Sequence, residues 1–317
     1  MKVFVTGATG VIGRRLVPML LANGHDVTAV ARSPIKSAQL RQQGATPIEV
    51  DLFDRTALVR AVAGHDAAIN LVTHIPNSTF RMLLRSAWRE NDRLRREASA
   101  NLVDACLAGR VSRFVQESFA PVYPDRGDQW IDESVPLSPV RYNRTVLDAE
   151  ASAARFSRSG GAGVVLRFGG FYGRDALQTD AFIQSVRRGW APIPGSPAAY
   201  ISSVSHDDAA TAARAALTLP AGVYNVVDDR PVTHREFFDS LAEAVGVPAP
   251  KFPPVWMTPL FGSIGEMAAR SLRISNRKLQ AASAWKPKYP SVREGWPAAI
   301  ARADGPESQK LLDRREA

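Results

Sequence analysis

The amino-acid sequence predicts an α/β protein with a doubly wound parallel sheet and a smaller, mostly helical lobe towards its C-terminal end. Short apolar runs alternate with stretches of helical periodicity over residues 1–168, and this order is typical of parallel strands joined by right-handed helical crossovers. Residues 169–200 are instead rich in glycine, proline and aromatic side chains, as ligand-binding loops often are. The chain has 317 residues, of which 45% are hydrophobic, so it is long enough to bury a sizeable core.

The individual elements follow from apolar runs and from the residues that start and stop helices. Strands are expected where short apolar runs end in turn residues, at 3–5, 27–30, 47–50, 67–72, 113–117, 164–168 and 223–227. Helices are expected where the apolar spacing is helical, at 11–22, 37–43, 55–63, 80–108, 141–157, 207–217, 233–245 and 260–272. Thr233 and Glu236 have the spacing of a capping box. The stretch 80–108 is long enough to form two helices, and the last strand can return to the sheet.

Composition excludes several kinds of site. Cys106 is the single cysteine of the chain, so neither an intramolecular disulfide nor a cysteine-based zinc site is available. The sequence offers no other metal-ligand cluster. No apolar run approaches the roughly 18 residues that span a bilayer, and the apolar run at the N-terminus is too short for a signal sequence. We therefore expect a cytoplasmic protein without a membrane partner.

The net charge of +9 favours anionic partners, and nucleotides are among them. A row of arginines spaced by four, Arg81, Arg85, Arg89 and Arg93, would share one stripe of a helix. Such a stripe serves as a solvated helix face or as an anion-contacting surface. A nucleic-acid-binding protein would add a recognisable binding motif to its basic patch, so we expect no nucleic-acid partner.

A glycine-rich loop joins the first predicted strand to the first predicted helix. Gly7 can make the tight turn, Gly10 lets a pyrophosphate approach the backbone, and Gly13 lets the helix pack against the strand. The N-terminus of the helix presents free N–H groups and a partial positive charge to the anion. The loop therefore predicts a dinucleotide site, held by Gly7, Thr9, Gly10, Val11, Ile12 and Gly13.

The end of the second strand indicates which dinucleotide is bound. Sites that prefer NAD carry an Asp or Glu there, on the ribose hydroxyls, whereas this strand ends in Ala31-Arg32-Ser33. The guanidinium of Arg32 can grip a 2′-phosphate with two hydrogen bonds. Ser33 can add a hydroxyl donor and Lys36 a second charge. We therefore predict NADP(H) rather than NAD(H), with a plain surface arginine as the alternative for Arg32.

With these segments the chain resembles the short-chain dehydrogenase/reductases, especially their extended and atypical branches, which include sugar-nucleotide epimerases. The loop at 6–13, Asp51-Leu52 after the third strand, Val122-Tyr123 and the segment 166–173 carry the resemblance. The resemblance implies a Rossmann-type sheet and a bound dinucleotide along nearly the whole chain. It adds further cofactor-binding residues: Asp51, Leu52, Leu71, Val72, Tyr142, Phe168 and Gly170.

The resemblance also implies how the chain divides. We expect residues 1–168 and about 201–230 to form the NADP-binding Rossmann domain. Residues of about 169–200 and 231–302 would form the substrate-binding lobe, and residues 303–317 a flexible tail.

The catalytic pattern of the family is altered. The family carries Tyr-x-x-x-Lys, in which tyrosine exchanges a proton with the substrate and lysine lowers its pKa. Tyr142 matches the tyrosine, but Val146 stands at the lysine position. Phe119 stands at the position of the family's serine, and Arg95 at that of an asparagine on the preceding helix. Tyr142 is left either as a proton donor with a pKa near about 10 or as a residue that lines the substrate site.

Two other side chains are candidates for the chemistry. His74 follows the fourth strand at the carboxyl edge of the sheet, where ligands bind, and it either donates a proton or serves the turn. Ser118 can hydrogen-bond the substrate carbonyl, although it lies one residue before the family's serine position.

The leading hypothesis is an NADPH-dependent ketoreductase that acts on a small or polycyclic ketone, such as an aromatic secondary metabolite. Aromatic side chains available for an apolar pocket are Phe80, Trp88, Phe119, Phe171, Tyr172, Trp190, Trp256 and Phe261. The alternatives are a sugar-nucleotide epimerase or dehydratase, and a dinucleotide-binding sensor or assembly protein without catalysis. The expected partner is the ketone substrate, and the protein is expected to be a monomer or a homodimer.

Overall fold

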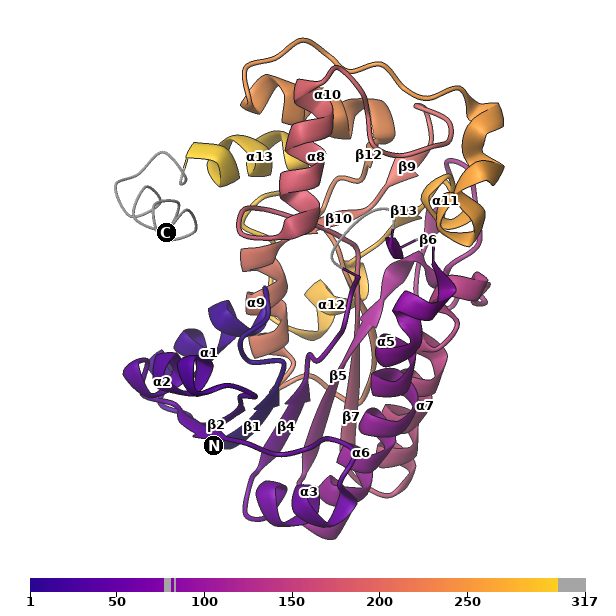
Figure 1. Ribbon diagram of the computed structural model, residues 1–317. Coiled ribbons are helices and arrows are strands. Elements are labelled where there is room, and N and C mark those ends of the chain that lie inside the picture. The colour runs from indigo at the N-terminus through magenta and orange to yellow at the C-terminus, as the bar shows by residue number, and fades with distance from the viewer. Residues whose placement is uncertain (77–80, 83, 302–317) are drawn as a thin grey trace.

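A computed structural model describes residues 1–76, 81–82 and 84–301 (Figure 1). The aromatic candidate Phe80 and the tail expected at 303–317 lie outside the described residues.

The centre of the molecule is a parallel sheet of seven strands in the order β3-β2-β1-β4-β5-β7-β11. Its strands are β1 Lys2–Thr6, β2 Asp26–Val30, β3 Thr46–Ile48, β4 Ala67–Asn70, β5 Arg113–Phe119, β7 Ala162–Phe168 and β11 Gly222–Val226. Strand order reverses between β1 and β4, which is where open α/β sheets bind their ligands. β11 pairs in parallel with β7, so the strand predicted at 223–227 does return to the sheet. The predicted doubly wound parallel sheet is confirmed.

Helices cover both faces of the sheet (Figure 1). Successive strand residues point to opposite faces, so Val5 packs in one core and Phe4 in the other. The first core contains residues of α1 Gly13–Ala22, α2 Pro34–Gln42, α9 His206–Ala215 and α12 Arg277–Ala282. The second contains residues of α3 Arg55–Val62, α6 Ser99–Ala108 and α7 Val146–Arg158.

The long helical stretch before β5 changes its winding along its length. It runs through a 3₁₀ turn Arg85–Trp88, α5 Arg89–Arg93, a π-helical turn Leu94–Ala98 and α6. In the π turn the backbone N–H of Ser99 donates to the carbonyl of Leu94, five residues back. This turn therefore contains one residue more than an α-helical turn. The stretch predicted as helical at 80–108 combines 3₁₀, α and π winding.

The later chain forms a lobe with its own core. Helices α8 Leu177–Arg187, α10 His234–Ala244 and α13 Val292–Ala301 contribute to it. Tyr172 and Trp296 are both fully buried there, with ring centroids 5.2 Å apart. Three short strand pairs lie beside the main sheet: β8 Gly170–Tyr172 with β10 Ser203–Ser205, β9 Tyr200–Ile201 with β12 Val232–Thr233, and β6 Trp130–Ile131 with β13 Arg273–Ile274. The capping box predicted from Thr233 and Glu236 is present at the start of α10.

Three predicted helices have the wrong bounds. The helix predicted at 141–157 begins as an α-helix only at Val146, after a 3₁₀ turn Arg141–Asn143 that contains Tyr142. The stretch 260–272 is not one helix, because a 3₁₀ segment Val255–Phe261 is followed by the short α11 Gly262–Ala268. Gly262 has a φ of +55° between them, a value outside the right-handed helical region. Helix α2 begins at Pro34 rather than Ser37, because the hydroxyl of Ser33 accepts from the N–H of Lys36 and proline fits the first helical position.

Within the described ranges, no helix combines the length and the apolarity needed to cross a membrane.

Candidate active site

The glycine loop is held tightly against its surroundings at two of its three glycines. Gly7 has a φ of +69°, and a Cβ atom on it would lie 2.6 Å from the carbonyl carbon of Leu71. A Cβ on Gly13 would lie 2.2 Å from the carbonyl oxygen of Gly7. Gly10 is exposed, and its Cβ would meet a single neighbour, the same oxygen at 3.2 Å. The first and third glycines are thus required by packing, whereas the second leaves the outer side of the loop open.

The open side of this loop lies at the start of α1. Ile12, the residue that precedes the helix, provides no side-chain acceptor for the first N–H groups. The N–H groups of Val11, Ile12 and Gly13 make no hydrogen bond with a described residue and can bind an anion, whereas those of Arg14 and Arg15 donate to the carbonyls of Gly10 and Ile12. Thr9 and Val11 are partly buried in the same loop, and Leu71 and Val72 continue from β4 directly against Gly7. These residues border the position where the strand order reverses.

The residues predicted to select the phosphate lie at the surface after β2. Arg32 and Lys36 are exposed, and Arg32 has no ion-pair partner among the described residues. Ser33 is partly buried and caps α2, with 3.4 Å between its hydroxyl oxygen and the nitrogen of Lys36. The positively polarised N-terminus of α2, the guanidinium of Arg32 and the ammonium of Lys36 therefore belong to one short segment, residues 32–36. Residues 31–36 contain no carboxylate.

The remaining predicted cofactor residues differ in what they can offer. The carboxylate of Asp51 accepts from the N–H of Phe53 at 3.0 Å and shapes the turn after β3. The carbonyl of the following Leu52 accepts from Asn101. Phe168 is fully buried in the sheet core, and the N–H of Gly170 donates to Ser202 at 2.9 Å. At β7 and β8 a ligand would therefore meet backbone rather than the Phe168 ring.

Tyr142 lies among aromatic rings near the carboxyl end of β5. Its ring is edge-on to Trp88, with centroids 4.5 Å apart, and to Phe119, at 6.5 Å. No described residue makes a hydrogen bond with its hydroxyl. Burial raises the pKa of Tyr142 to about 12, while Arg95 acts to lower it and Glu117 to raise it further. Val146 is fully buried in the first turn of α7, so no cation from that position acts on the phenol.

The structure separates Ser118 from this group. Ser118 is 1% exposed, and its hydroxyl donates to Oε1 of Glu150 at 2.5 Å. The same carboxylate accepts two hydrogen bonds from Arg167, at 2.8 and 2.6 Å. Arg167 also donates to the hydroxyl of Tyr123. Ser118 therefore belongs to a buried network that joins β5, α7 and β7, and its hydroxyl already has a partner.

His74 is placed at the expected edge but makes no contact with Tyr142. Its side chain is exposed, and no hydrogen bond joins its imidazole to a described residue. Its backbone N–H donates to the side-chain oxygen of Asn91 at 2.9 Å. This hydrogen bond holds the loop that follows β4 against helix α5.

Glu117 and Arg95 act electrostatically on Tyr142, and no sequence motif predicted a role in the site for either of them. Glu117 is partly buried two residues before the end of β5. Burial raises its pKa, which Arg95 acts to lower and Glu150 to raise. Arg95 is 5% exposed. A run of three polar residues, Gln116, Glu117 and Ser118, at the ligand-binding edge of the sheet is the sequence signal that could have found Glu117.

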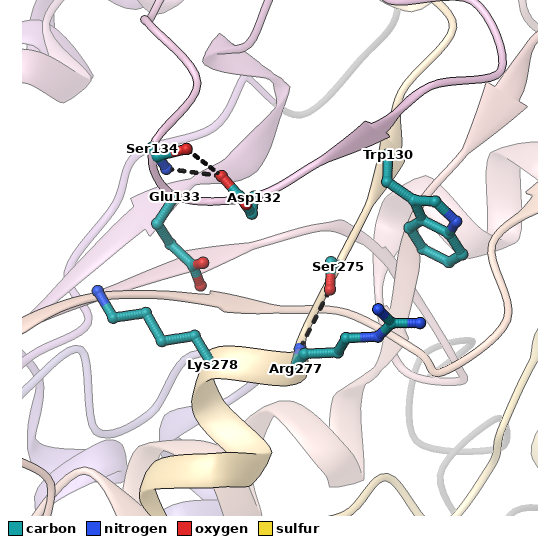
Figure 2. Close-up of a pocket in the computed structure, with 7 residues that line it drawn as sticks. All are labelled: Trp130, Asp132, Glu133, Ser134, Ser275, Arg277 and Lys278. Atoms are coloured by element: carbon teal, nitrogen blue, oxygen red, sulfur yellow. Dashed lines mark hydrogen bonds between the residues drawn. The ribbon is translucent and has the colours of Figure 1, made fainter.

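A cavity of about 510 Å³ lies elsewhere, between β6, β13 and α12 (Figure 2). Its lining residues are Trp130, Asp132, Glu133, Ser134, Ser275, Arg277 and Lys278. The carboxylate of Glu133 accepts from the N–H of Asn225 on the edge strand β11. Neither the glycine loop nor Tyr142 lines this cavity, so it is separate from the candidate active site. Nor do the described residues include a group of carboxylates, histidines and cysteines that could hold a metal.

Comparisons with known proteins agree with this geometry. The profile of the NAD(P)H-binding family matches residues 7–186. A 3-diazoavenalumate denitrifying reductase of a Streptomyces species is 33% identical over 308 residues, which cover 93% of this chain and 99% of that protein. The 4-hydroxy-2-methyl-3-oxo-4-farnesyl-3,4-dihydroquinoline-1-oxide ketoreductase of Stigmatella aurantiaca is 30% identical over 261 residues, covering 78% and 75%.

Solved structures share the fold over nearly the whole chain. UDP-glucose 4-epimerase of Thermus thermophilus, in complex with NAD, superposes with a TM-score of 0.76 at 26% identity, covering 96% of this chain and all of the other. A human epimerase family protein with NADPH superposes with a TM-score of 0.79 at 22% identity, covering 95% and 99%. The sheet order, the glycine loop and these similarities show that the chain belongs to the NAD(P)H-binding Rossmann family, as an atypical, epimerase-like short-chain dehydrogenase/reductase and an NAD(P)-dependent oxidoreductase.

Proposed function

We propose that the protein is an NADPH-dependent reductase of a small or polycyclic aromatic ketone. The observation that carries the proposal is the state of Tyr142. Burial raises its pKa to about 12, and Val146 replaces the cation that would lower it. At neutral pH such a phenol keeps its proton, so it is an acid and a poor base. Ketone reduction needs an acid, whereas an epimerase cycle must first remove a proton from a sugar hydroxyl.

Aromatic surroundings support an aromatic substrate. Trp88, Phe119 and Tyr142 gather at the carboxyl edge of the sheet, and stacked or edge-on rings add about 0.5–1.5 kcal/mol beyond the burial of area. The ketoreductase relative acts on a quinoline ring system, as its name states.

NADPH is favoured over NADH by the residues after β2. Arg32 and Lys36 provide positive charge, Ser33 provides a hydroxyl, and residues 31–36 contain no carboxylate that would repel a 2′-phosphate. The open loop at Gly10 and the free N–H groups at the start of α1 suit a pyrophosphate. Bound there, NADPH supplies the hydride that reaches the carbonyl carbon.

The proton for the carbonyl oxygen comes from a side chain, from water or from a hydroxyl of the substrate, and two side chains are placed to supply it. Tyr142 is one donor, and Glu117 is a second, because burial raises its pKa and so keeps more of it protonated. The charge of Glu117 acts to raise the pKa of Tyr142, which supports a place for both groups at one site.

The test is NADPH oxidation by the purified protein with a panel of aryl ketones, followed by absorbance. We expect one NADPH consumed for each alcohol formed, and weaker binding of NADH than of NADPH. Turnover of a nucleotide sugar without net cofactor consumption would identify an epimerase instead. Cofactor binding without turnover of any ketone would favour a sensor or assembly protein.

A second reaction is favoured by the same altered residues. Val146 and Phe119 replace two groups that serve proton transfer, and one class of hydride acceptor needs no proton. An aryldiazonium ion takes up one hydride and gives the arene and N₂, so NADPH becomes NADP⁺ and the charges balance. The relative named as a denitrifying reductase supports this alternative. Release of N₂ from an aryldiazonium salt, dependent on NADPH, would distinguish it from ketone reduction.

A further inference from the structure

Arg95 is a buried charge without a partner. Its side chain is 5% exposed, and its Nη1 has no hydrogen-bond acceptor among the described residues. In that part of the chain no carboxylate oxygen lies within 4.0 Å of its guanidinium, since Arg95 takes part in no ion pair. The neighbouring Arg96 is exposed and pairs with Asp148. Only Arg95 of these two arginines therefore carries an uncompensated charge.

The protein cannot remove this charge by titration. A guanidinium stays protonated in proteins, and a buried ion without a partner costs several kcal/mol. Arg95 acts to lower the pKa of Glu117, but no ion pair joins the two side chains, and burial raises the pKa of that carboxyl. No described residue supplies the compensating anion, which leaves room for an anionic ligand.

Asn91 adds a second free donor one helical turn before Arg95. It is fully buried, its Oδ1 is occupied by the N–H of His74, and its Nδ2 has no acceptor among the described residues. Side chains four positions apart are neighbours on a helix surface. The π turn Leu94–Ala98 lies at this point, and such turns are frequent at functional sites.

These donors belong to the candidate active site. Arg95 acts electrostatically on both Tyr142 and Glu117, and Tyr142 packs against Trp88. The cofactor's phosphates have their own donors at the glycine loop and after β2. An anionic group of the substrate is therefore the occupant that fits.

We propose that Arg95 and Asn91 form a carboxylate-binding subsite, so that the substrate is an aromatic carboxylate anchored there by its anionic group. This inference rests on the proposed reductase function, whose substrate class it narrows. A guanidinium binds a carboxylate through two parallel hydrogen bonds. The aromatic ring of the substrate then lies beside Tyr142, which is only partly buried, with its reducible group towards the cofactor.

Binding without turnover tests the subsite directly. Benzoate, cinnamate and 2-naphthoate are titrated into the NADP⁺-bound protein by calorimetry, each beside its own carboxamide, which has the same shape and no charge. Because a hydrogen bond to a charged group contributes about 1.5–3 kcal/mol, at least one carboxylate should bind about 10- to 100-fold more tightly than its amide. Arg95→Met should abolish that preference, and Arg95→Gln is the second variant if Met impairs folding.

Arg96→Met is the matched control, because it removes an exposed arginine from the next position and should leave the preference intact. NADP⁺ affinity should be unchanged in every variant. Equal binding of all three carboxylates and their amides to the wild type, or a preference that survives in Arg95→Met, would overturn the subsite. A carboxylate preference that depends on Arg95 in a protein that reduces nothing would instead retain the subsite and refute the reductase. Reduction of neutral ketones without any carboxylate preference would support the reductase and refute the subsite.

Discussion

Replacing Tyr142 by phenylalanine measures how far the proton relay depends on this residue. A well-placed general acid contributes about 10²–10⁴-fold to a rate. Here the pKa of the phenol is raised from about 10 to about 12, and a difference of two pKa units corresponds to about 2.7 kcal/mol against giving up the proton. Among the described residues no hydrogen bond orients the hydroxyl, and Glu117 is the proposed second acid. We therefore expect Tyr142→Phe to lose less than about 10²-fold in the rate of ketone reduction.

The assay is single-turnover NADPH oxidation by wild type and variant with any ketone that the protein reduces. Glu117→Gln keeps the shape of the carboxyl group and removes its proton, so it provides the matched comparison. If the two acids substitute for each other, the double variant should lose more than the product of the single losses. A loss of about 10³-fold or more for Tyr142→Phe alone, with cofactor affinity and folding unchanged, would refute the reasoning.

The pH profile separates the two donors. An acid catalyst works in its protonated form, so its contribution is complete below its pKa and is lost as the pH rises through it. If Tyr142 donates, the rate should hold through neutral and moderately alkaline pH, because its pKa is about 12. If Glu117 donates, the rate should fall at a lower pH, on passing through its raised pKa, and Glu117→Gln should remove that limb.

Three further variants test the cofactor site and the buried network. Arg32→Glu should abolish the preference for NADPH in paired titrations with NADH, and unchanged selectivity would show that Arg32 does not contact the 2′-phosphate. Gly10→Val should fold, because its Cβ meets only one atom at 3.2 Å, yet lose NADPH binding; wild-type affinity would contradict the assigned phosphate loop. Glu150→Gln leaves the buried Arg167 without its carboxylate, so the free energy of unfolding should fall by about 3–5 kcal/mol in urea titrations, and a change below 1 kcal/mol would argue against the network.

Local patterns in the sequence were sufficient for much of the fold. The tight contacts of Gly7 and Gly13 follow from glycine spacing after a buried strand, and the start of α10 follows from the capping box of Thr233 and Glu236. The helix predicted at 260–272 was wrong because Gly262 takes a positive φ after a 3₁₀ segment. Helical periodicity alone does not reveal such an interruption.

The arrangement of the candidate site depends on side-chain directions and on packing between elements, which the spacing of residues in the sequence does not reveal. Ser118 and Glu117 are adjacent, and neighbouring side chains of a strand point to opposite faces. An error of one residue in the predicted position would therefore exchange the side chain that faces Tyr142 with the one that faces Glu150 on α7. Arg95, Glu117 and Tyr142 come from three elements well separated in the chain, and only the packed structure brings their charges together.

The π turn at Leu94–Ala98 has a consequence for how relatives of this protein diverge. A residue added to a helix rotates everything on one side of it by about 100° relative to the other side. Removing one residue from this turn would restore regular winding and swing Arg95 away from Tyr142, although every side chain kept its identity. Gain or loss of a single residue in this turn can thus change whether the Arg95 side chain points towards Tyr142 or away from it. When related sequences are aligned, a one-residue gap between Arg93 and Ser99 would mark relatives in which this helix winds regularly.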